Sequence, residues 1–256
     1  TPNNDNMPGN TGRSFMKMVT GMALAAALAT GAAMGAVAQS RGDAADYKFT
    51  YTYPAEARRI PALRAWLEGD AARLRAATAR DAAEARRQAR KEGFPFRQYE
   101  TQKSWKLVAS TPRFLSLSGD VYSYTGGAHG NPGSLGLLWD KAVGRRLEPK
   151  AVFTSDAALQ AAIGTPFCAR LNVERTRKRG APPSGDGMFD KCPKIGELTV
   201  LLGSSNNSRI NRIGLIADPY VAGPYAEGAY EVTLPVTAAL LRVVKPAYRA
   251  AFAIGR

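Results

Sequence analysis

The chain has 256 residues, 45% of them hydrophobic, and its formal net charge is +14. This apolar content supports a buried core and excludes a disordered polyelectrolyte, and the length fits one large domain or two small ones. The positive charge predicts attraction to polyanions such as nucleic acid, anionic lipid or acidic wall polymers, without choosing among them.

Residues 1–38 have the composition of a targeting segment. Arg13 and Lys17 precede an apolar run at 18–35 that consists mostly of Ala, Leu, Met and Gly, and a small-x-small motif ends at Ala38. A membrane anchor, the alternative, carries bulkier apolar side chains over about 20 positions. We therefore expect upstream residues and a cleaved signal peptide, a periplasmic or secreted protein, and no transmembrane anchor after cleavage.

Residues 39–110 predict two strands around a long helix. Aromatic residues alternate with polar ones between Tyr47 and Tyr53, which is typical of a strand with one buried face. Residues 61–92 carry a one-sided apolar stripe that starts at a proline and ends before a glycine, so we expect a helix there. Residues 99–110 predict the second strand.

The last turns of that helix, residues 80–91, are rich in arginine. Asp81, Glu84 and Glu92 offset part of the charge, and no aromatic residues that would stack on bases are interleaved. A solvated charged face is therefore the better interpretation. We expect no nucleic-acid partner, while contact of this face with lipid stays open.

Residues 122–131, Tyr-Ser-Tyr-Thr-Gly-Gly-Ala-His-Gly-Asn, join a predicted strand at 115–121 to another at 135–139. The glycines permit a tight loop, and an Asn-Pro-Gly turn reverses the chain. His129, the one histidine of the sequence, has two interpretations. It is either a proton shuttle or ligand, or a ring that fixes the loop through a hydrogen bond.

Two helices are expected next, at residues 157–163 and 167–179, because each stretch follows a helix-start signal. Residues 180–187 predict a surface loop. Cys168 and Cys192 are the two cysteines of the chain, and in an oxidising compartment we expect them to form a disulfide that contributes about 3 kcal/mol. The alternative, a nucleophilic thiol paired with the histidine, would leave the second cysteine without a role.

The C-terminal third predicts strands at 198–202, 210–216 and 230–234 and a short helix at 237–244. A loop rich in Pro, Tyr and Gly, residues 218–228, is either a recognition surface or an aromatic plug over the end of the sheet. The predicted fold class is α+β: antiparallel sheets with one long N-terminal helix and shorter helices packed against them.

The chain resembles the paired extracytoplasmic domains of unknown function named after PdaC and RsiV, in four stretches at residues 113–117, 124–131, 144–153 and 219–228. Those domains are the non-catalytic part of a peptidoglycan deacetylase and the lysozyme-sensing exterior of an anti-sigma factor. The resemblance covers most of the mature chain and implies a PdaC-like N-terminal half at 39–110 and an RsiV-like C-terminal domain at 111–256.

What the resemblance implies is an exported α+β fold that binds at the cell envelope. It does not imply deacetylation, because catalysis in those relatives belongs to a separate metal domain with paired histidines. The chain also lacks a membrane span followed by a cytoplasmic sigma-binding region. An anti-sigma role is therefore not expected.

We expect a soluble exported domain that binds peptidoglycan or another anionic polymer of the envelope, or a wall-acting protein such as lysozyme. The predicted contact residues are His129, Asn131, Tyr220, Tyr225 and Glu227. No catalytic set, metal site or cofactor is expected. The alternative is a wall-glycan hydrolase in which His129 acts as general base with Glu227 or Asp120 as its partner, which requires that these groups lie close together.

Overall fold

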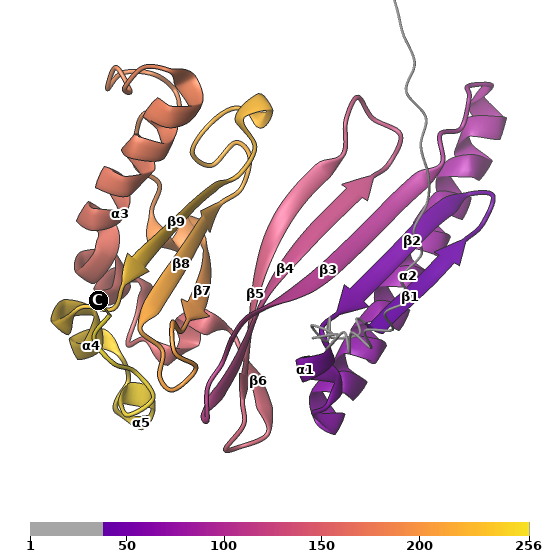
Figure 1. Cartoon of the computed structure of the whole chain (residues 1–256). Coiled ribbons are helices and arrows are strands. Elements are labelled where there is room, and N and C mark those ends of the chain that lie inside the picture. Colours follow the sequence, from indigo (N-terminus) through magenta and orange to yellow (C-terminus); the bar gives the residue numbers. More distant parts are fainter. Residues whose placement is uncertain (1–37, 256) are drawn as a thin grey trace, which may run out of the picture. The chain divides into compact units, whose positions relative to one another are not determined.

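The computed structural model describes residues 38–255, so the predicted signal peptide lies almost entirely outside the described residues. Six strands form one sheet in the order β1-β2-β3-β4-β5-β6 (Figure 1). Its strands are β1 (Ala38–Asp43), β2 (Tyr47–Tyr53), β3 (Tyr99–Ser110), β4 (Phe114–Tyr124), β5 (Asn131–Asp140) and β6 (Arg145–Leu147).

The connection between β2 and β3 contains α1 (Ala55–Arg58) and the long helix α2 (Pro61–Glu92). Proline occupies the first turn of α2, and Gly93 ends the helix in the left-handed conformation with φ 74°. Both ends agree with the prediction, because a proline start and a glycine stop are local signals. The long crossover makes β2 and β3 the one parallel pair among the described strands of this sheet, and the other pairs are antiparallel, as predicted.

Helix α2 packs its apolar face on β2 and β3. Leu63 and Leu67 are fully buried there against the aromatic face of β2 and Trp105 of β3. The indole of Trp105 donates a hydrogen bond of 2.8 Å to the hydroxyl of Tyr51, which itself donates to Asp70 at 2.8 Å. Burial, followed by the hydrogen bond to Asp70, raises the pKa of Tyr51. The alternating aromatic pattern of β2 therefore buries rings and still satisfies their polar atoms.

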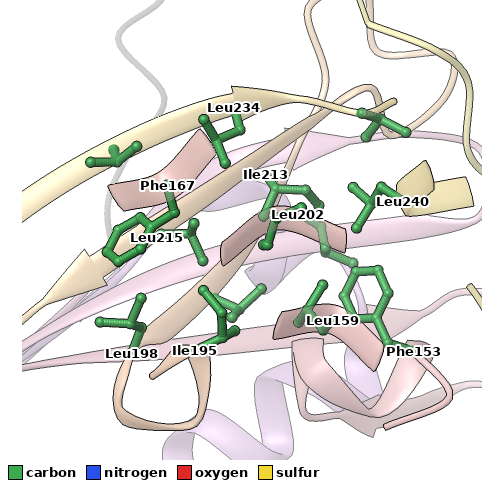
Figure 2. Packing of buried hydrophobic residues seen from close by; sticks show 14 of the residues in the cluster. Phe153, Leu159, Phe167, Ile195, Leu198, Leu202, Ile213, Leu215, Leu234 and Leu240 are labelled. Atoms are coloured by element: carbon green, nitrogen blue, oxygen red, sulfur yellow. The ribbon is translucent and has the colours of Figure 1, made fainter. Parts of the chain in front are cut away.

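The second sheet has three antiparallel strands, β7 (Thr199–Gly203), β8 (Arg212–Ala217) and β9 (Tyr230–Pro235), in that order. Its core is aliphatic and aromatic, with side chains from the strands meeting those of helix α3 (Figure 2). The remaining elements are α3 (Asp156–Arg179), α4 (Ala238–Val243), α5 (Pro246–Arg249) and the 3₁₀ turns η1 (Pro149–Val152), η2 (Ile195–Glu197) and η3 (Tyr225–Glu227). The α+β fold class is thereby confirmed.

Helix α3 is one continuous helix, so the prediction of a break and a second start before residue 167 is wrong. Pro166 lies inside it. The proline removes one backbone donor, but Leu159, Ile163, Phe167 and Leu171 follow one another at spacings of four residues and are all buried in the core. Shared burial of one apolar stripe outweighs the local interruption.

The two sheets approach most closely where β5 faces β7. A Cβ atom built on Gly136 would lie 2.6 Å from the backbone carbonyl oxygen of Val200, so only glycine fits at this point. The hydroxyl of Thr199 donates to the backbone carbonyl of Ser134 at 2.9 Å. The C-terminal sheet is thus held directly against the strand that follows the histidine loop.

Candidate functional site

Two loops meet at the predicted site: the β4–β5 hairpin loop, residues 125–130, and the β8–β9 loop, residues 218–229. The ring of Tyr225 stacks on the imidazole of His129 with centroids 4.1 Å apart. The Tyr225 hydroxyl donates a hydrogen bond of 2.9 Å to the carbonyl of Gly130. The ring of Tyr220 lies 5.9 Å from that of Tyr225. Residues almost a hundred positions apart in sequence therefore form one aromatic group.

The backbone of both loops is specialised for this contact. Gly130 is buried under Tyr122, and a Cβ atom there would lie 2.2 Å from that ring. Tyr220 has φ 72°, a left-handed conformation that is uncommon for a residue with a side chain, and its amide donates to the Gly223 carbonyl at 2.8 Å. Such strained positions concentrate where a structure presents a side chain for function, and the Tyr220 side chain is 58% exposed.

Asp218 fastens the start of the β8–β9 loop to β5. Its carboxylate accepts hydrogen bonds from the amide of Ser134 at 3.1 Å and from the Ser134 hydroxyl at 2.7 Å. Asp218 was not among the contact residues predicted from the sequence. The Asp-Pro dipeptide at 218–219 was the available signal, since aspartate before proline commonly starts a turn.

A cleft of about 500 Å³ opens between β4, β5 and the β8–β9 loop. Four carboxylates line it, from Asp120, Asp218, Glu227 and Glu231, and Tyr225 forms part of its wall. Within the described chain, no lysine or arginine belongs to this lining. The lining of the cleft is therefore acidic, although the protein as a whole has a net charge of +14.

Two of these carboxylates are already partnered. Asp120 pairs with Lys106 at the surface, and Glu227 accepts from Arg179 at 2.9 and 3.1 Å. Burial alone would raise the pKa of Glu227, but the Arg179 guanidinium and the Tyr230 hydroxyl outweigh it and hold the pKa below its usual value. Among the described residues, the ion pairs include neither Asp218 nor Glu231, although the positive charge of Lys178 interacts with Glu231 at longer range.

Helix α3 anchors the β8–β9 loop from below through Arg175, whose side chain is fully buried. Its guanidinium donates at 3.0 Å to the carbonyl of Ala222 in that loop. It also donates at 3.0 Å to the carbonyls of Asp190 and Lys191, in the segment that follows α3. Arg175 therefore links the β8–β9 loop to the segment that follows α3.

The disulfide predicted between Cys168 and Cys192 is present, with Cα atoms 5.7 Å apart. It joins α3 to the end of the segment that Arg175 also holds, and it rules out a free thiol nucleophile at either position. In the same segment, Asp190 pairs with Arg179 at 2.9 Å. The disulfide holds the segment that contains Asp190 against α3, and Arg179 of α3 pairs with both Asp190 and Glu227 of the β8–β9 loop.

The five residues predicted from the sequence gather unevenly. Tyr225 and Glu227 line the cleft, and His129 lies against Tyr225. The imidazole is exposed, its Nδ1 lies 2.9 Å from the Gly130 carbonyl, and in the described part of the chain no hydrogen bond joins it to a carboxylate. Tyr220 adds an exposed ring beside Tyr225, whereas Asn131 is exposed at the start of β5 and is not part of the cleft lining.

Two further properties concern residues 38–255 as a group. Nowhere among them do three His, Cys, Asp or Glu side chains gather in a way suited to a metal ion. No helix of this part of the chain combines the length and the apolar character needed to cross a bilayer.

Residues 41–132 match the family model described as deacetylase PdaC. A DUF3298 family protein from Pseudomonas aeruginosa PAO1 is similar in structure, with 16% identity and a TM-score of 0.46 over 87% of this chain and 98% of that one. A DUF3298 family member from Bacteroides fragilis NCTC 9343 is 16% identical, with a TM-score of 0.49 over 78% and 91%. No curated protein matches.

Proposed function

We propose that this chain, in which residues 41–132 carry a PdaC-like domain, is an exported binding protein of the cell envelope. Its cleft between β4, β5 and the β8–β9 loop receives a basic group of a wall-acting protein such as lysozyme. The observation that carries this proposal is the inversion of charge: the cleft of a +14 protein is lined by four carboxylates.

Charge complementarity favours a cationic partner at this place. Two strongly basic proteins repel each other at long range, so association requires a local acidic patch on one of them. Asp218 and Glu231 supply such a patch within a concave surface, where a lysine or arginine of the partner would be partly desolvated and more strongly attracted than in bulk water. An anionic wall polymer would be repelled by the same cleft.

The aromatic group beside the cleft supplies contact area. Tyr225 is held by the His129 stack and by its hydrogen bond to Gly130, so it loses little freedom when a partner binds. Tyr220 is exposed next to it. Tyrosines fixed in this way are typical anchors of protein interfaces.

Isothermal titration of the purified protein with a cationic lysozyme tests the proposal. We expect binding that weakens with added salt, and affinity losses of about tenfold for Tyr225→Ala and several-fold for Glu231→Gln. Glu92→Gln, which removes an exposed carboxylate of α2 far along the chain from the cleft, is the matched control and should bind as the parent does.

Absence of binding, or equal losses from Glu231→Gln and Glu92→Gln, would refute the assignment of the cleft. A hydrolase would be indicated instead if the purified protein released fragments from wall glycan and His129→Ala abolished that release. Such a result would replace the binding function by the enzymatic one.

A further inference from the structure

On the other side of the β4–β5 hairpin loop the surface has a different chemistry. Two hollows, of about 330 and 380 Å³, flank the segment that follows α2. Phe94 and Phe96 line both of them, and the first also contains Thr125 and Gly126 of the hairpin loop. The hairpin that borders the acidic cleft therefore also borders this second surface.

Aromatic rings form the apolar part of the second surface. Phe94 follows the left-handed Gly93 and is 50% exposed, an unusual position for a phenylalanine. The rings of Phe96 and Tyr99 stack at 5.9 Å with their planes 22° apart, and the guanidinium of Arg86 lies 5.9 Å above the Phe96 ring. These contacts fix the Phe96 ring, and Phe94 is the exposed ring of the surface.

The charge of this surface is opposite to that of the cleft. Arg86, Arg90 and Arg97 line the two hollows, and no Asp or Glu of the described chain belongs to either lining. Arg86 is paired with Asp46. Arg97 makes one hydrogen bond in the described structure, to the Tyr124 hydroxyl at 3.4 Å, and Arg90 takes part in no ion pair of the described residues. Two guanidinium groups are therefore available for an anion.

The geometry points to a second binding site here, for an anionic glycan that carries carboxylate groups, separate from the cleft and from its basic partner. A sugar ring has an apolar face that packs on the exposed side of Phe94, as apolar groups pack on aromatic surfaces. Carboxylates pair with guanidinium groups through two parallel hydrogen bonds. Gln88 and Gln98 also line the hollows; their amide nitrogens donate to Glu92 and to the Ala44 carbonyl, and their amide oxygens suit sugar hydroxyls as acceptors.

The site does not depend on the proposed function, because its residues come from α2, the following segment and the tip of the hairpin. A flat anionic bilayer would contact Phe94 and the arginines but would leave the two hollows unfilled. A glycan strand fills concave surfaces of this size with single sugar units. The hollows therefore favour a glycan over a lipid surface.

The test uses the purified protein and an oligogalacturonate, a glycan with one carboxylate per sugar, as the probe in a calorimetric titration. We expect Phe94→Ala and Arg97→Gln each to lower the affinity about tenfold. Arg80→Gln is the matched control for Arg97→Gln, since it removes the same charge from an exposed position of α2 outside the two hollows, where the side chain pairs with Asp81. This control and Asp218→Asn in the cleft should bind the probe as the parent protein does.

Three results would overturn the inference. The first is the absence of oligogalacturonate binding, and the second is a loss in Arg80→Gln equal to that in Arg97→Gln, which would mean attraction by net charge alone. The third is equal binding of polyphosphate of the same charge, because polyphosphate offers no sugar face to Phe94. Since both substituted side chains are exposed or surface-facing, unchanged thermal unfolding of the variants will verify that they fold.

Discussion

Replacement of Arg175 by methionine tests whether the β8–β9 loop is held by α3. Methionine keeps a long unbranched side chain and removes the guanidinium that donates to the carbonyls of Ala222, Asp190 and Lys191. Ala222 is fully buried, and its carbonyl would keep only the longer hydrogen bond from Arg179 at 3.4 Å, whereas Lys191 is exposed and its carbonyl regains hydration.

The magnitude follows from these environments. Leaving the buried Ala222 carbonyl with only the longer Arg179 hydrogen bond costs about 1 kcal/mol, and loss of the two hydrogen bonds to the partly hydrated carbonyls adds about 1 to 2 kcal/mol. Burial lowers the pKa of Arg175, which means that burying its charge opposes folding, and methionine relieves this cost. We therefore expect the free energy of unfolding to fall by about 2 kcal/mol.

Urea unfolding followed by circular dichroism measures the change, with a lower midpoint at an unchanged slope. Arg177→Met is the control: Arg177 lies on the same helix, is exposed and pairs with Glu174, and its loss should change stability by less than about 0.5 kcal/mol. Titration with lysozyme should also show weaker binding by Arg175→Met, because the loop that carries Tyr225 is less well held. Equal effects of the two replacements on stability would refute the anchoring role.

Three further predictions concern the same half of the chain. The double replacement Cys168→Ala/Cys192→Ala opens a loop with a sequence separation of 24 and should lower the free energy of unfolding by about 3 kcal/mol. A reductant should cause the same loss in the parent protein and no further loss in the variant. The Ser184 hydroxyl, ahead of the other donors, lowers the pKa of Asp190 from 3.8 to about 2. Ionised Asp190 therefore contributes fully to folding stability above its ordinary pKa, and this contribution is lost as the pH falls towards 2. Asp190→Asn should make the free energy of unfolding depend less on pH in this range, and an unchanged dependence would contradict the assignment. Gly136→Ala should lower stability by about 1 to 3 kcal/mol in thermal unfolding because its Cβ would meet a β7 carbonyl at 2.6 Å, and an unchanged melting temperature would show that the sheets can separate there.

Local signals in the sequence predicted the elements whose limits are set by single residues. The bounds of α2 were predicted correctly because a proline at the first position and a glycine in the left-handed conformation act within one turn. Alternation of aromatic and polar residues likewise predicted β2, in which Phe49, Tyr51 and Tyr53 are buried and the residues between them are more exposed. The disulfide was predicted because the chain has two cysteines and because we expected export to an oxidising compartment.

Features that depend on tertiary contacts could not be predicted in this way. The carboxylates of Asp120 and Asp218 are almost a hundred positions apart, and only the register of β4 with β5 and the approach of the two sheets bring them to one cleft. No pattern in the sequence singled out Arg175, whose side chain is fully buried. The continuity of α3 past Pro166 was not predicted, because a proline locally favours a helix start, whereas burial of the apolar face of α3 keeps the helix continuous.

The pairing of β4 with β5 has a practical consequence for anyone who isolates part of this protein. The family match ends at residue 132, only one residue beyond the start of β5 at Asn131. A fragment cut there would strip β4 of its neighbour and expose a row of open backbone donors and acceptors along an eleven-residue edge, which invites chains to pair with one another. Truncations intended to keep the six-stranded sheet intact should extend beyond Leu147.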